Sequence, residues 1–160
     1  MKFSLVLMIA MATISSKVFS QVNYALPQTW TKDLVITASR GGGSLYQKMS
    51  IKITYDSCRF DQIIQNKATK NAFLMTPALR AELLNKLHQL KADKIRPSSE
   101  IALSYDKTTS AITFQDDHGL FWAADGDLSQ IHEDDEKNFR EAFNSLVTFA
   151  TTKHKKRSRN

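Results

Sequence analysis

The chain has 160 residues, of which 22 are Lys or Arg and 16 are Asp or Glu, so its formal net charge at neutral pH is +6. This length suits one domain, and a single cysteine, Cys58, excludes a fold held together by internal disulfides. The excess charge is local: five of the last eight residues are basic, whereas residues 21–152 hold 15 basic and 16 acidic residues. The folded body is therefore close to neutral.

Residues 1–20 have the features of a secretory signal peptide. A lysine at position 2 precedes an apolar run over residues 3–11, and the segment ending at Ser20 offers residues that a signal peptidase reads. Polar residues between Thr13 and Lys17 make the run too short for a membrane-spanning helix. We therefore expect a secreted or periplasmic protein that is not transmembrane and has no nucleic-acid partner.

The stretch from Asp33 to Asp56 predicts a long β-hairpin. Leu34-Val35-Ile36-Thr37 is rich in β-branched residues, and apolar and polar residues alternate from Gln47 to Tyr55. Glycines between the two runs can supply the positive φ angles of a hairpin connection. The next polar stretch, Asp61 to Lys70, is compatible with a loop or a short helical turn.

Two helices are expected. Thr76-Pro77 combines an N-cap with proline at the first helical position, and leucines recur on one face until the helix ends near Ala92. The second helix is predicted from about Asp134 to Thr152, with acidic residues at its start, as the helix dipole favours.

Short strands are predicted between these helices, at residues 101–105, 112–114 and 120–124. The order of elements indicates an α+β fold: an antiparallel sheet of about four to five strands with two helices packed on one face, in a ββα-ββα-like order. We expect one domain over residues 21–152, followed by a basic tail over residues 153–160. The tail either touches an anionic surface or only solubilises the chain end.

The connection inside the hairpin is the first candidate site. The pattern disfavours a phosphate loop, because a strand follows the glycines and no lysine stands in place. An exposed binding tip and a slack turn both remain open. The candidate binding residues are Arg40, Gly41, Gly42, Gly43 and Tyr46.

The second candidate is acidic. Five oxygen-bearing side chains stand at the spacing of a calcium-binding EF-hand loop: Asp125, Asp127, Ser129, Glu133 and Glu136. Gln130 replaces the glycine of the sharp turn, and a strand instead of a helix leads in. A charged helix start explains the same residues, so no metal and no cofactor is expected.

Nothing in the sequence specifies a catalytic centre. His88, His118 and His132 do not have the close pairing that metal sites usually show, and no nucleophile turn of the G-x-S-x-G type occurs. Cys58 follows a strand, where a small buried apolar group is the expected role. We expect a protein that is not an enzyme.

The layout resembles the emfourin family of small protein inhibitors of thermolysin-like metalloproteases. The features that carry the resemblance are a hairpin with a Gly41-Gly42 tip, a helix opening at Thr76-Pro77, a strand pair closing at Ala124-Asp125-Gly126, and a final helix. It covers residues 33–152, and the chain departs from it by its signal peptide, its strand at residues 101–105 and its basic tail. The resemblance implies a protein that blocks a secreted protease and performs no catalysis.

The sequence thus favours an exported, non-enzymatic binding domain whose partner is another protein, with protease inhibition as the activity that the resemblance implies. Two alternatives stay open. One is an envelope-associated structural or surface-binding protein that uses the basic tail, and the other is an enzyme of unrecognised type. An exposed apolar patch would favour a binder, and a concave pocket with convergent polar groups would favour an enzyme.

Overall fold

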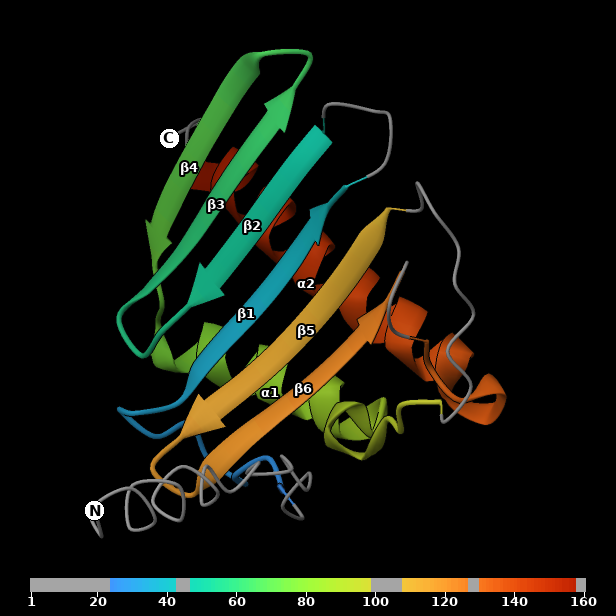
Figure 1. Cartoon of the computed structure of the whole chain (residues 1–160). Coiled ribbons are helices and arrows are strands. Elements are labelled where there is room, and N and C mark those ends of the chain that lie inside the picture. The colour runs from blue at the N-terminus through green and yellow to red at the C-terminus, as the bar shows by residue number, and fades with distance from the viewer. Residues whose placement is uncertain (1–23, 43–46, 99–107, 127–129, 158–160) are drawn as a thin grey trace, which may run out of the picture.

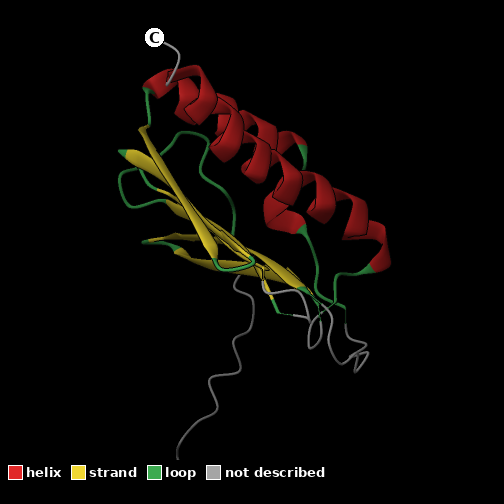
Figure 2. Ribbon diagram, turned by 90° about the horizontal axis from the view of Figure 1, so that it is seen from above, coloured by secondary structure: helices red, strands yellow, loops and turns green. Residues whose placement is uncertain are grey.

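The computed structural model describes residues 24–42, 47–98, 108–126 and 130–157, with side chains as far as Thr152. A six-stranded antiparallel sheet forms one layer and two helices form the other, and both helices cover the same face of the sheet (Figures 1 and 2). The α+β class is confirmed, whereas the expected four to five strands were too few.

The strands follow one another in a simple pattern. They are β1 Val35–Gly41, β2 Gln47–Ile53, β3 Ser57–Ile64, β4 Lys67–Leu74, β5 Thr109–Asp116 and β6 Gly119–Asp125. Their order in the sheet is β4-β3-β2-β1-β5-β6, so β4 and β6 are the edge strands of the sheet that the structure describes. The strand predicted at residues 101–105 lies outside the described residues.

The helices begin where the sequence predicts. In α1, Pro77–Gln89, the backbone N–H of Leu79 donates to the Thr76 hydroxyl at 3.3 Å, which confirms the N-cap. A short 3-10 helix, η1 (Ala92–Lys94), follows it, and another, η2 (Glu133–Asp135), precedes the second α-helix. That helix, α2, spans Glu136–Arg157 and so continues beyond Thr152 into the segment expected to be a tail.

The core lies between the sheet and the two helices. Leu83 and Leu87 of α1 are 2% and 0% exposed, and Phe143 and Leu146 of α2 are equally buried. Ile36, like the other residues of its parity along β1, points to the same side. The leucine face of α1 is therefore placed as its spacing predicts.

The segment from Asp61 to Lys70, expected as a loop or a helical turn, forms most of the β3–β4 hairpin. Gln65 and Asn66 connect the two strands with φ angles of 46° and 65°. Two consecutive left-handed residues are the geometry of the type I′ turn, whose twist matches that of a two-stranded hairpin. This hairpin supplies the strands that the sequence-based count lacked.

Residues before β1 pack against the edge of the core. Tyr24 and Leu26 are buried, and the Tyr24 hydroxyl donates to a carboxylate oxygen of Asp116 at 2.9 Å. Burial and this nearby carboxylate raise the pKa of Tyr24 well above its ordinary value. Trp30, further along this segment, is partly buried against the same core.

Candidate functional site

Arg40 belongs to β1, ahead of the connection to β2. In the sheet it stands beside Met49 of β2 and Ser110 of β5, and it shares its parity with the buried Ile36 and Ala38. Alternate residues of a strand face the same side of a sheet. The side chain of Arg40 therefore lies on the helix-covered face.

Two contacts hold the Arg40 side chain there. Its Nε donates a hydrogen bond to the Ser110 hydroxyl at 3.0 Å, and its guanidinium carbon lies 4.6 Å from the centroid of the Phe143 ring. The second contact has the distance of a cation–π interaction. Arg40 is nevertheless exposed, so its charged group is fixed in place and still faces solvent.

A cavity of about 490 Å³ adjoins Arg40 between the sheet and the first half of α2. We call it the Arg40 cavity. Arg40, Ser110 and Asp125 follow one another across β1, β5 and β6, which places Arg40 and Asp125 two strand spacings apart, about 10 Å. Glu136 and Arg140 of α2 also line it. Two candidate sets that are separate in the sequence thus contribute to one mixed-charge cavity.

The remaining residues of the hairpin set are distributed differently. Gly41 ends β1, and Gly42 follows it with a φ of 90°, a left-handed conformation that suits glycine. Gly43 and Tyr46 lie outside the described residues.

The calcium-like spacing does not produce a cluster of ligands within the described ranges. No group of three or more His, Cys, Asp or Glu side chains placed to hold a metal ion occurs there. Glu133 lies in η2 and Glu136 begins α2, so both belong to a charged helix start, while Asp127 and Ser129 lie outside the described residues. Asp125 remains relevant as a wall of the Arg40 cavity.

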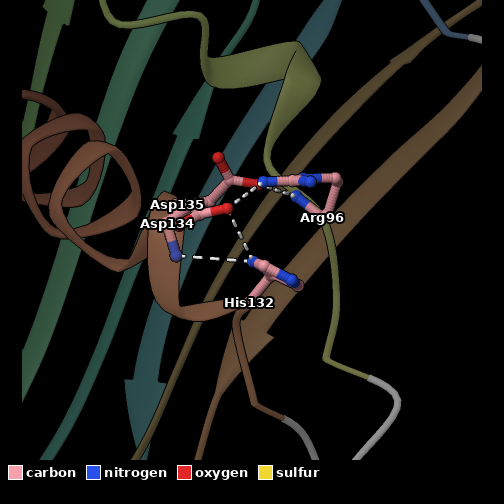
Figure 3. A network of polar contacts seen from close by, with 4 residues as sticks. All are labelled: Arg96, His132, Asp134 and Asp135. Atoms are coloured by element: carbon pink, nitrogen blue, oxygen red, sulfur yellow. Dashed lines mark hydrogen bonds and ion pairs between the residues drawn. The ribbon is translucent and has the colours of Figure 1, made fainter.

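A polar network that the sequence did not suggest lies next to this cavity (Figure 3). The guanidinium of Arg96 donates to the carboxylates of Asp135 and Asp134 at 2.7 and 3.2 Å, and its backbone N–H donates to Asp135 at 3.0 Å. These bonds lower the pKa of Asp135 below its ordinary value. The network fixes the segment before α2 to the chain that follows η1, and so supports the cavity wall.

The histidines and the cysteine have structural surroundings. His88 Nε2 lies 3.0 Å from the carbonyl oxygen of Pro27, and His132 Nδ1 accepts from the backbone N–H of Asp134 at 3.4 Å. Cys58 is fully buried, and this burial raises the pKa of its thiol to about 12. A thiol with that pKa is almost entirely protonated at neutral pH, which is the wrong state for a nucleophile.

A second, larger cavity of about 900 Å³ lies between α1 and α2. Its charged lining residues are Glu82, Lys86 and Glu141, accompanied by amide and hydroxyl side chains. All three charged residues are exposed, and none of the amide or hydroxyl side chains is buried. This second cavity therefore offers no buried polar group that would orient a substrate.

Comparisons with known proteins identify no relative of this chain. No family model matches the chain, and neither the curated proteins nor the solved structures contain a match. Across the residues that the structure describes, neither helix has the length and apolar character needed to cross a membrane.

Proposed function

We propose that this chain is an exported binding domain that engages another protein at the Arg40 cavity. One observation carries the proposal: Arg40 is held by Ser110 and Phe143 and remains exposed beside a cavity. Arginine is among the residues that most often anchor protein interfaces. An arginine that is already fixed loses less conformational freedom when a partner binds, so more of its interaction energy appears as affinity.

The charges of the cavity indicate what a partner would present. Arg40 and Arg140 are cationic, Asp125 and Glu136 are anionic, and all four line the same space. A polar or charged side chain inserted from a partner would find groups of either sign. This mixed charge favours recognition of a shaped protein surface over attraction to a uniformly charged polymer.

The resemblance to the emfourin family supplies the partner class within this proposal, a secreted thermolysin-type metalloprotease. Groups with strongly shifted pKa values often mark catalytic sites. A non-enzymatic role is supported by the causes and the positions of the shifted groups in this domain. Tyr24, Asp33, Cys58, Arg96 and Asp135 have such shifts, and each shift arises from burial or from hydrogen bonds within the domain. None of these five lines the Arg40 cavity.

The test is inhibition of a thermolysin-type metalloprotease by the chain that begins at Gln21. We expect inhibition at micromolar concentration or below, and a loss of about tenfold or more on Arg40→Ala, as for an interface anchor. Arg59→Ala is the matched control, since it removes an arginine from the opposite face of the sheet. Absence of inhibition by the parent would contradict the protease as partner, and equal inhibition by both variants would exclude the Arg40 cavity.

A second candidate function rests on the extent of α2. Because the helix continues to Arg157, the basic residues from Lys153 to Arg157 extend it, and a surface-binding role would use this helical end. Ending the chain after Thr152 should then reduce its retention on an anionic surface at low ionic strength. Unchanged retention would exclude this role.

A further inference from the structure

The face of the sheet that is turned away from the helices carries a line of polar and charged side chains. We call this side of the sheet the outer face. One row crosses five adjacent strands, and its members stand opposite one another in the strand register: Arg59, Lys52, Thr37, Thr113 and Trp122. With neighbouring strands about 4.8 Å apart, the row is roughly 19 Å long. It runs from a cationic end at β3 to an aromatic end at β6.

The cationic end has an unfavourable arrangement of charge. Lys52 and Arg59 are direct partners across β2 and β3, and both are exposed. Like charges in this position destabilise a sheet. One row further along, Asp61 stands opposite Lys70 of β4, so the same sheet elsewhere pairs opposite charges. Lys48 adds another exposed cation to this side of β2. A bound anion would relieve the repulsion between Lys52 and Arg59.

The other end of the row presents a ring. Trp122 is 46% exposed, and Leu120, two residues earlier on the same edge strand, is 41% exposed. Thr37 and Thr113 lie between this ring and the cations, and Ser39 and Ser50 stand in the adjacent row. The surface between the two ends is therefore rich in hydroxyl groups, which donate and accept hydrogen bonds.

We infer that the outer face binds an acidic polysaccharide along this row, a function beyond the protein-binding role proposed above. The anionic group of one sugar would lie between Lys52 and Arg59. The apolar face of another sugar would stack on Trp122, whose indole combines a large apolar surface with one polar group. The threonine hydroxyls would meet sugar hydroxyls in the middle of the row.

Other partners fit this surface less well. A protein interface has a centre poor in charge and rich in apolar groups, whereas the cations here belong to the central strand β2 and its neighbour β3. Single-stranded nucleic acid stacks successive bases on several aromatic side chains. Trp122 is the one aromatic residue with outer-face parity in the described strands. A single stacking position combined with separate cations matches an anionic sugar chain.

The test is a binding titration of the chain that begins at Gln21 against polygalacturonate, with neutral dextran as the uncharged probe. We expect binding to polygalacturonate alone, and weaker binding as salt screens the exposed cations. Lys52→Gln with Arg59→Gln should reduce the affinity about tenfold, the effect of losing two exposed charge contacts. Trp122→Ala should reduce it independently of salt. Lys86→Gln with Lys137→Gln, on the helix layer, is the charge-matched control.

Each outcome decides the proposal. Affinity that falls only in the outer-face variants supports it, as does retained binding by Arg40→Ala, which separates this surface from the Arg40 cavity. An equal loss in the helix-layer control would overturn it in favour of general charge attraction. No binding, or tighter binding to polyglutamate, oligothymidylate or phosphatidylglycerol vesicles, would also overturn it. Because removing the repulsion between Lys52 and Arg59 should leave folding intact or improved, thermal unfolding of that variant distinguishes lost binding from lost structure.

Discussion

The guanidinium of Arg40 lies over the ring of Phe143, 4.6 Å from its centroid, and so connects the end of β1 to the first half of α2. A chain separation of about a hundred residues is bridged by one contact at the rim of the core. The same arginine also bonds Ser110. These two contacts explain why the side chain of Arg40 is held in place although glycines follow it in the sequence.

Removing this contact should cost a small, measurable amount of stability. We expect Arg40→Ala to lower the free energy of unfolding by about 1 kcal/mol, because a partly exposed cation–π contact contributes roughly 0.5–1 kcal/mol. Arg59→Ala, which relieves a like-charge pair, should cause no loss. Urea unfolding of both variants measures the difference. Equal stability of the two variants would show that the Phe143 contact contributes nothing.

The buried leucines of α1 should dominate the stability of the helix layer. Leu83→Ala and Leu87→Ala should each cost about 2–5 kcal/mol, since each leaves a cavity in a closely packed core. Lys86→Ala, an exposed change on the same helix, should stay within about 0.5 kcal/mol. Chemical denaturation compares the three, and a leucine variant as stable as the lysine variant would contradict the assigned helix face.

Gly126 is placed where no side chain fits. A Cβ built at this position would lie 2.6 Å from the Thr109 Cα, whereas the nearest atom to a Cβ at Gly41 is 3.9 Å away. We expect Gly126→Ala to destabilise the fold by about 1–3 kcal/mol, as overpacking does. Gly41→Ala should be neutral or slightly stabilising. Paired thermal denaturation curves test this difference, and the opposite ranking would show that β5 and β6 can separate at no cost.

The network around Arg96 predicts a pH dependence of stability. Its hydrogen bonds lower the pKa of Asp135 below the ordinary value of 3.8, so the folded state binds this proton less readily than the unfolded state. The resulting stabilisation is present above about pH 4 and is lost as the pH falls through the depressed pKa.

Arg96→Gln should therefore reduce stability near neutral pH, and the gap between variant and parent should narrow below pH 4. Lys137→Gln, an exposed change at the start of α2, is the control for a general charge effect. Denaturant midpoints measured from pH 7 to pH 3 follow the gap. A constant gap would mean that the carboxylate of Asp135 is not the titrating partner.

The helices and the central strands could be predicted because burial leaves a pattern in them. The leucine spacing of α1 and the alternation along β2 both report one covered face. The strand β4 has no such pattern, because Phe73 is its one buried residue and the strand extends past the helix layer at the edge of the sheet. The signal that the sequence offered for the β3–β4 hairpin was Asn66 in its turn, since asparagine tolerates the left-handed conformation better than most residues.

The candidate site was less predictable for a physical reason. The sequence places Arg40 next to glycines, but only strand register brings it to Ser110, 70 residues away. Asp125 and Glu136 were selected for calcium-like spacing, and the structure places both in the lining of one cavity. Long-range pairing of strands decides these neighbours, and local composition carries no record of it.

The position of β5 beside β1 has a consequence for the order of folding. Strands β1 to β4 pair with their neighbours in the chain, and β5 pairs with β6 across a two-residue turn. Joining these two local units requires closing the long connection through α1. The conformational entropy of this connection is lost before the contacts between β1 and β5 form. We expect this closure to limit the folding rate. Changes at the β1–β5 boundary, such as Ile112→Val, should then slow folding, while changes in the β3–β4 hairpin should mainly speed unfolding.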